Sequence, residues 1–255
     1  MGKTKKKLSE PVRPISPGPR RKHLKSASPG ASTSPANEEP SPAETPTAES
    51  KGSATPATVS GGKGTRGPIA TISAGEIAGY EKYPGNVQKV LDVAIGLTTQ
   101  NLGYKYGSAD PASGGMDCSG FIHYVLSKSG LTDVPRDARE QYIWVRKAGT
   151  FQAVLGHSDD TFELDALKPG DLLFWSGTYH VDRDPSITHT MIYLGREKAN
   201  NQRIMVGASD GRTYKGQSRF GVSVFDFKVS HLAPKADGLS PVFVGYGRVP
   251  GLKDE

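Results

Sequence analysis

The chain of 255 residues carries 32 Lys and Arg against 26 Asp and Glu, giving a formal net charge of +6 at neutral pH, and it contains one cysteine. A single cysteine excludes an intramolecular disulfide framework and any zinc site built from several cysteines. The basic excess lies in residues 1–70, which hold 12 basic and 5 acidic residues. Residues 71–255 hold 20 and 21 and are nearly neutral, which argues against a nucleic-acid-binding core.

The first predicted segment is a disordered arm over residues 1–72. Residues 1–70 contain no Phe, Trp or Tyr, so they cannot bury enough apolar surface to offset the entropy lost on ordering. The lack of aromatic residues also argues against specific nucleic-acid binding, while the basic charge suits contact with anionic polymers. No apolar stretch follows the basic start, so no secretory signal peptide is expected, and no run is long enough for a membrane span.

Three helices are predicted after about residue 80. They begin at Asn86, Asp117 and Asp137, whose side chains can cap a helix, and the last two end at Gly130 and Gly149. Apolar residues recur at helical spacing in the first of them. This stripe consists of Val87, Val90, Leu91, Ala94, Ile95 and Leu97.

Five strands are predicted after the helices, because short β-branched and aromatic runs alternate there with Gly, Pro or Asp turns. Helices followed by strands indicate an α+β domain over residues 73–255, with N-terminal helices packed on an antiparallel sheet. A segment of this length suffices for one core. The predicted strands are 171–175, 190–195, 203–209, 221–227 and 242–249.

The single cysteine, Cys118, would be the first residue of the second helix. The unpaired N–H groups and the dipole at a helix start stabilise a thiolate, so the pKa of Cys118 is expected to fall below the usual value of about 8.5. Ser119 and Gly120 are small and would let a substrate approach the sulfur. A buried, unreactive thiol is the alternative, since unpaired cysteine is among the most buried residue types.

A nucleophilic thiol needs a base, and the chain offers six histidines. His189 opens the strand predicted over HTMIYLG, residues 189–195, and a rigid strand end positions a base better than a loop does. His180 lies in a loop and is the second candidate. The others lie in the arm, in polar loops, or on a part of the second helix that points away from Cys118. His189 is therefore predicted to be the general base.

Five motifs occur in order along this part of the chain. They are GYKYG at 103–107, DCSGF at 117–121, VPRDA at 134–138 with Gln141 shortly after, LKPGDLLFW at 167–175 and HTMIYLG at 189–195. Together they resemble the NlpC-type cell-wall peptidases, a branch of the papain-like cysteine peptidases. The resemblance runs from about residue 87 to residue 248. It implies a papain-like fold, with the cysteine on a helical portion that packs on a sheet carrying the histidine.

The resemblance also assigns roles. It implies that Cys118 is the nucleophile, that His189 is the general base, and that Tyr104 lies beside the thiol and contacts the substrate or the oxyanion. The backbone N–H of Cys118 would donate to the oxyanion. Members of the family typically cleave amide bonds in peptidoglycan stem peptides, often between D-glutamate and a diamino acid. The pocket that reads the amine and acidic groups of such a peptide would be shaped by Asp117, Ser119 and Arg136.

One position departs from the family pattern. The residue that orients the imidazole, commonly a histidine on the following strand, is replaced here by Gly207. Asp210 and Ser209 lie just beyond it, and Asp210 is the candidate for a third catalytic residue. A turn role for Asp210, with a backbone carbonyl or a water molecule orienting the imidazole instead, is the alternative.

The sequence therefore predicts a cysteine-type peptidase, an endopeptidase or amidase that hydrolyses peptidoglycan stem peptides by a Cys-His thiolate mechanism. The alternatives are an acyltransferase on the same scaffold and a catalytically impaired domain that binds the wall or another partner. No metal or other cofactor is expected, because no ligand cluster is visible. The family implies an extracytoplasmic or cell-wall location, although no signal peptide is visible.

Overall fold

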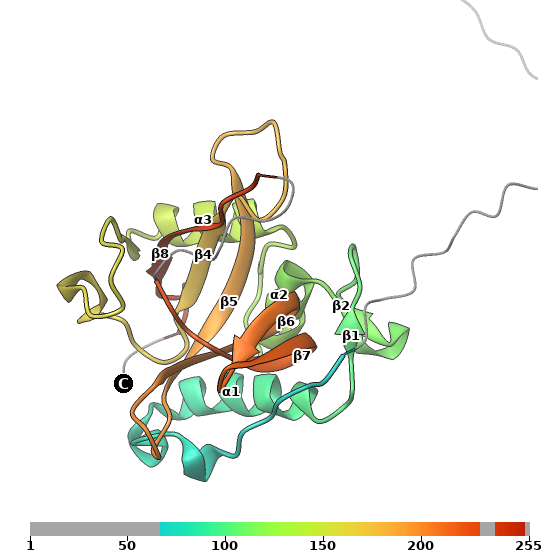
Figure 1. The fold of residues 1–255 in the computed structure, drawn as a ribbon, viewed down its shortest axis with the longest axis vertical. Coiled ribbons are helices and arrows are strands. Elements are labelled where there is room, and N and C mark those ends of the chain that lie inside the picture. The colour runs from blue at the N-terminus through green and yellow to red at the C-terminus, as the bar shows by residue number, and fades with distance from the viewer. Residues whose placement is uncertain (1–66, 230–237, 253–255) are drawn as a thin grey trace, which may run out of the picture. The chain divides into compact units, whose positions relative to one another are not determined.

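The computed structural model describes residues 67–229 and 238–252. Nearly all of the predicted arm lies outside the described residues, so its disorder stays a prediction. The described residues form three α-helices and a six-stranded antiparallel sheet (Figure 1). The predicted α+β class, with helices that precede an antiparallel sheet, is confirmed.

Two of the three predicted helix starts are confirmed. Asp117 caps α2 (Cys118–Lys128) and Asp137 caps α3 (Ala138–Lys147), each through a side-chain oxygen that accepts a backbone N–H. The cap predicted for α1 (Gly85–Thr98) is wrong, because the N-cap is Pro84 and Asn86 lies in the first turn. The fixed φ of proline suits a helix start, and its missing N–H costs nothing there.

The large sheet follows the order β3-β8-β4-β5-β6-β7. Beside it, a short parallel pair joins β1 (Gly103–Tyr104) to β2 (Gly115–Met116) and leads into the start of α2. The strands of the large sheet are β3 (Phe151–Ala153), β8 (Val242–Gly247), β4 (Leu172–Ser176), β5 (Ile187–Arg196), β6 (Arg203–Tyr214) and β7 (Gln217–Asp226).

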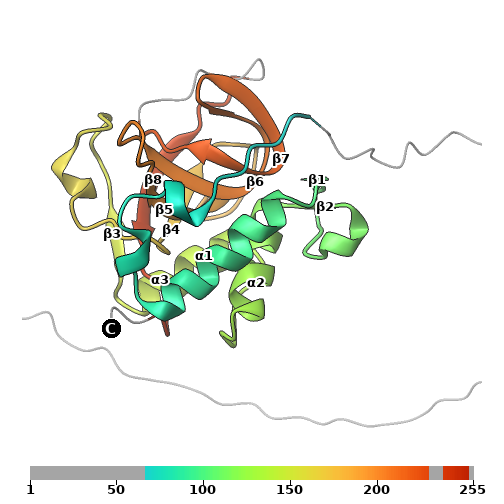
Figure 2. The same cartoon turned by 90° about the horizontal axis from the view of Figure 1, so that it is seen from below.

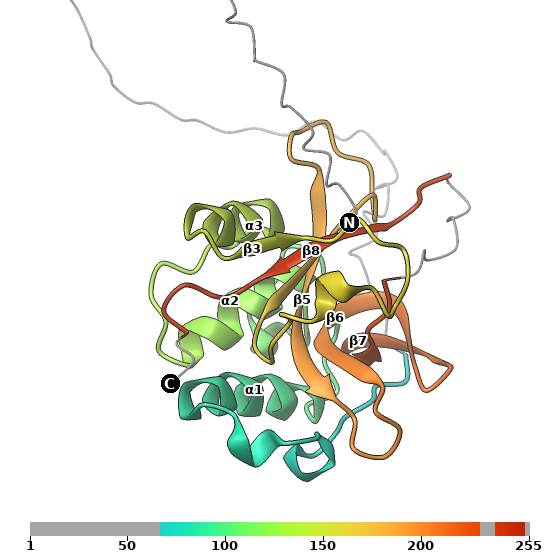
Figure 3. The same ribbon diagram turned by 90° about the vertical axis from the view of Figure 1, so that its left-hand side faces the viewer.

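Both faces of the sheet are covered by apolar side chains. The three helices lie along one face, as Figure 3 shows, and α2 and α3 both contact β5. On β5, Ile192 and Leu194 pack toward the helices, while Met191 and Tyr193 belong to a second apolar cluster with Trp175. This alternation is the period of two expected of a strand buried on both faces. It makes β5 the central strand against which α2 is positioned.

The edge strand β7 is covered by the first described residues. The amides of Phe220 and Val224 donate to the carbonyls of Pro68 and Ala70 at 3.2 and 2.9 Å, and Ala70 and Ile72 are buried. The amide of Val222 donates to the carbonyl of Leu102, so the outer edge of β7 is paired over several residues. Residues 68–72, which the sequence assigned to the arm, therefore pack on the domain.

Candidate active site

The start of α2 is built by Asp117. Its Oδ1 accepts the N–H of Gly120 at 2.6 Å, and its own N–H donates to the carbonyl of Ser108 at 3.0 Å. A Cβ at residue 120 would lie 2.1 Å from the Ser108 oxygen, so only glycine lets the 105–108 loop approach the helix this closely. This packing buries Cys118 at the first helical position, with 5% of its surface exposed.

The protonation state of Cys118 differs from the sequence-based expectation. Burial, followed by the carboxylate of Asp117, raises the pKa of the thiol to about 12, although N–H groups of Thr190, Ser119 and Cys118 itself oppose the shift. Desolvation at this position outweighs the helix dipole. The predicted lowering of the pKa is therefore wrong, and the resting residue is a neutral thiol.

Cys118 lies against the strand that carries His189. The amide of Thr190 is within hydrogen-bonding reach of the sulfur, and Thr190 directly follows His189 in β5. The His189 side chain is buried, and its ring centroid lies 5.7 Å from that of Trp175. His189 lies inside β5, two residues after its first residue, while the rival His180 is exposed. The strand thus fixes the backbone of His189 firmly beside the thiol.

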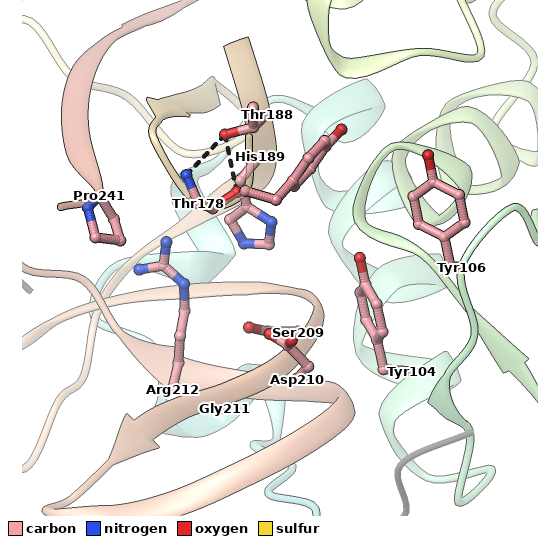
Figure 4. Close-up of a pocket in the computed structure, with 11 residues that line it drawn as sticks. Tyr104, Tyr106, Thr178, Thr188, His189, Ser209, Asp210, Gly211, Arg212 and Pro241 are labelled. Atoms are coloured by element: carbon pink, nitrogen blue, oxygen red, sulfur yellow. Dashed lines mark hydrogen bonds between the residues drawn. The ribbon is translucent and has the colours of Figure 1, made fainter. Parts of the chain in front are cut away.

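A pocket of about 460 Å³ opens in front of His189 (Figure 4). Tyr104 and Tyr106 stand on one side of it, and Arg212 extends from β6 on the other, with its guanidinium between His189 and Pro241. The segment after β4 joins the wall, where Thr178 donates to Thr188 Oγ1 from both its amide and its hydroxyl. The remaining lining residues are Tyr179, Ser209, Asp210 and Gly211.

Tyr104 lines this pocket and also lies near Cys118. Burial, followed by the nearby Cys118 and Asp117, raises the pKa of its phenol, so the hydroxyl keeps its proton at neutral pH. Tyr104, Tyr106 and Tyr179 also line a second pocket of about 290 Å³. The three tyrosines therefore line both pockets, one of which contains His189 and the other Asp117 and Ser119, the neighbours of Cys118 in the chain.

The second pocket contains the predicted substrate-binding residues. Arg136 binds Asp117 through two hydrogen bonds, Nη2 to Oδ2 at 2.7 Å and Nη1 to Oδ1 at 3.0 Å. Arg136 Nη1 also donates to Ser119 Oγ at 3.1 Å. The three residues predicted for this pocket thus lie together, with the Asp117 carboxylate buried and the guanidinium partly exposed.

Asp210 lies in the pocket of His189 but does not bond to it. Its side chain is exposed, and it makes no hydrogen bond or ion pair within the part of the chain that the structure describes. Gly207 is buried, and a Cβ there would meet Met191 Cγ at 2.9 Å. The strand β5 therefore fills the space in which a third catalytic side chain at residue 207 would start.

Two residues of the site were missed by the sequence analysis, and Arg212 is the first. A β-bulge separates the pairs Ser209–Gly221 and Arg212–Arg219, so Asp210 and Gly211 together oppose one residue of β7. The bulge lies in the curled β6–β7 hairpin of Figure 2 and turns Arg212 into the pocket. No local signal in the sequence announces such a bulge.

Gln141 is the second. Gln141 is fully buried in α3, and its Nε2 donates to the carbonyls of Ser119 and Pro135 at 2.9 and 2.8 Å. It ties the first turn of α2 to the loop that carries Arg136. The resemblance included this glutamine as a motif residue, but its positioning role becomes apparent only from the fold.

Comparisons with known proteins agree with the family resemblance of the motifs. Residues 101–218 match the NlpC/P60 family. The murein DD-endopeptidase MepH of Escherichia coli is 28% identical over 120 residues, 46% of this chain and 38% of that protein. The probable endopeptidase YafL of Escherichia coli is 30% identical over 112 residues, 43% of this chain and 38% of that protein. The gamma-DL-glutamyl hydrolase of Bacillus subtilis is 36% identical over 92 residues, 36% of this chain and 18% of that protein.

The chain thus spans about two fifths or less of the length of these relatives. Among the residues that the structure describes, no helix is long and apolar enough to cross a membrane. The same residues contain no group of three or more His, Cys, Asp and Glu side chains suited to a metal ion.

Proposed function

We propose that this chain, whose residues 101–218 match the NlpC/P60 family as the motifs predicted, hydrolyses amide bonds in peptidoglycan stem peptides. The observation that carries the proposal is the position of the buried Cys118 thiol against the strand of His189, with one pocket at His189 and another at Asp117 and Ser119. The relative named as a murein DD-endopeptidase supports a cell-wall peptide substrate, and the relative named as a gamma-DL-glutamyl hydrolase supports cleavage of a gamma-glutamyl bond.

In the proposed mechanism, His189 first takes the proton of the Cys118 thiol. A neutral resting thiol suits this step, because the ionic form is then generated only when substrate displaces water from the pocket. The sulfur attacks the amide carbonyl, and the N–H of Cys118 and the protonated hydroxyl of Tyr104 are the donors proposed to stabilise the oxyanion. The imidazolium then protonates the leaving amine, and water releases the acyl-enzyme.

The second pocket is proposed to hold the amino-terminal side of the substrate. Asp117 fixes the plane of the Arg136 guanidinium, while part of that group stays exposed toward the pocket. A paired guanidinium and carboxylate present donors and acceptors side by side, which suits the amine and acid groups of a stem peptide. Ser119 Oγ adds a further polar contact on the same wall.

Purified protein incubated with muropeptides, with products identified by mass spectrometry, tests this function. We expect cleavage by the wild type and loss of at least about 10³-fold in rate for Cys118→Ala and for His189→Ala, because nucleophile and base act as one unit. His180→Ala is the matched control and should keep the wild-type rate, since His180 is exposed and lies outside the residues lining the pocket. Absence of products, or a Cys118→Ala protein as active as the wild type, would contradict the proposal.

One observation favours a second candidate, a domain that binds cell-wall peptides without efficient turnover. The space beside Gly207 is filled by Met191, so the family's usual orienting side chain has no counterpart there. On this alternative, muropeptides bind but stay intact in the same assay. An acyltransferase would instead yield adducts when an amine acceptor is added, which the mass spectra would distinguish from hydrolysis products.

A further inference from the structure

Arg212 is a buried cation on the wall of the pocket that contains His189. Only 9% of its surface is exposed, and its guanidinium carbon lies 4.3 Å from the centre of the Trp175 ring. Among the described residues, it has no hydrogen-bond or ion-pair partner. Burial lowers the pKa of this guanidinium to about 10, so the side chain stays charged at neutral pH. A buried charge without a counter-ion is costly unless a ligand supplies one.

The placement of Arg212 defines which part of a substrate it can meet. It shares its pocket with His189, whereas Asp117, Ser119 and Arg136 line the other pocket beyond the tyrosines. His189 is the group proposed to protonate the leaving amine, so its pocket receives the leaving side of the scissile bond. Cys118 lies close enough for its thiolate to raise the pKa of the Arg212 guanidinium. A residue bound on the leaving side therefore lies within reach of the guanidinium.

We infer that Arg212 binds a carboxylate on the leaving side of the substrate and that the domain therefore prefers substrates whose leaving residue carries a free carboxylate. The inference rests on the proposed function. The Trp175 ring holds the guanidinium in place before binding, which lowers the cost of ordering it. A planar guanidinium can bind both oxygens of a carboxylate, and the burial of the site strengthens that contact.

Asp210 lines the same pocket and must be considered with Arg212. Its carboxylate makes no ion pair with the guanidinium, although the two residues are close enough to interact electrostatically. Asp210 is exposed to solvent while Arg212 is buried. Solvent screens the exposed charge more strongly, so the guanidinium retains its attraction for an anion.

The test uses two tripeptides, L-Ala-γ-D-Glu-L-Lys with a C-terminal carboxylate and the same peptide as its carboxamide. We expect wild-type kcat/KM to be about 10- to 100-fold higher for the carboxylate, as for hydrogen bonds to charged groups. Arg212→Gln should bring the ratio close to one, and Arg212→Lys should keep part of it. Arg219→Gln is the matched control, because it removes the same charge from the paired strand without touching the pocket.

The ratio compares two substrates on one protein sample, so partial unfolding of a variant does not change it. A wild-type ratio near one, or an Arg212→Gln protein that keeps the ratio, would overturn the inference.

If the wild type cleaves neither peptide, the failure concerns the proposed function. Titration calorimetry with Cys118→Ala then tests Arg212 alone, since the carboxylate peptide should bind about tenfold more tightly and lose this advantage in Cys118→Ala/Arg212→Gln. Equal affinities, or no binding of either peptide, would overturn the inference.

Discussion

The pocket of Arg136 and the pocket of His189 differ in whether their charged side chains are paired within the protein. In the pocket of Asp117, Ser119 and Arg136, the charges of Asp117 and Arg136 are paired by a bidentate contact, and the third charged residue, Asp137, pairs with Arg183. In the pocket of His189, Asp210 is exposed and Arg212 is buried, and neither has an ion-pair partner among the described residues. A paired charge positions the backbone around it, whereas an unpaired one is available to a ligand. The first pocket is preformed, and the second is completed by its substrate.

The largest expected effect in the comparison concerns Asp210, the predicted third catalytic residue. Its carboxylate faces the His189 pocket and would stabilise the imidazolium that forms during turnover. Because Asp210 is exposed, the contribution is screened, and Asp210→Ala should lower kcat about tenfold with little change in KM. Steady-state kinetics on a muropeptide substrate measures both constants.

The control for this prediction is Asp182→Ala, which removes a carboxylate from the loop before β5 without touching either pocket. It should leave kcat unchanged. A kinetically silent Asp210→Ala would mean that Asp210 serves only the bulge, and a backbone carbonyl or a water molecule would then orient His189. Gly207→His is not a simple rescue, because its Cβ would collide with Met191.

The start of the site was predictable because its signals are local. Asp117 and Asp137 are good N-caps, and glycines end α2 and α3, so the sequence placed Cys118 at a helix start correctly. The cap of α1 was misassigned because Pro84 is followed closely by Asn86 and either residue can start a helix. These features depend on a few neighbouring residues, as capping does.

The features that failed to appear in the sequence analysis are tertiary. The raised pKa of Cys118 comes from burial under the 105–108 loop and beside β5, which no helix signal reports. The position of Arg212 depends on the bulge at Asp210 and Gly211, which reverses the face that the following residue presents. The motifs of the resemblance found the paired pocket and named Tyr104, His189 and Asp210 of the other one, while the place of Arg212 emerged only from the fold.

The next largest expected effect is on the pKa of the Cys118 thiol. This pKa should shift in opposite directions when the charge of Asp117 or that of Arg212 is removed. Asp117 raises the pKa of Cys118, so Asp117→Asn should lower it, and Asn still caps the helix. Arg212 interacts favourably with the thiolate, so Arg212→Gln should raise it. Alkylation by iodoacetamide, followed between pH 7 and 10, reports the thiolate fraction. At pH 8 we expect a rate several-fold faster for Asp117→Asn and slower for Arg212→Gln, because one pKa unit is about tenfold in thiolate.

Shifts of the Cys118 pKa in the same direction in both variants would contradict the opposite effects expected of Asp117 and Arg212. Arg219→Gln again serves as the matched control and should alkylate at the wild-type rate. Thermal midpoints measured beside the rates exclude a general loosening of the fold, which would accelerate alkylation in every variant.

The smallest expected effect concerns the residues that cover the outer edge of the sheet, next to the strand that carries Arg212. Residues 68–72 cover the outer edge of β7, and β7 pairs with the strand that carries Arg212. Deletion of residues 1–66 should leave the thermal midpoint within about 2 °C, because that segment contains no aromatic residues and little apolar surface. Deletion of residues 1–72 also removes the buried Ala70 and Ile72. Burying one large aliphatic side chain stabilises by about 1.5–3 kcal/mol, so the midpoint should fall by roughly 5 °C. Calorimetry of the two truncated proteins and the full chain measures this difference. Equal midpoints for both truncations would show that the edge of β7 needs no cover, and a large loss already at residue 66 would show that the arm packs on the domain.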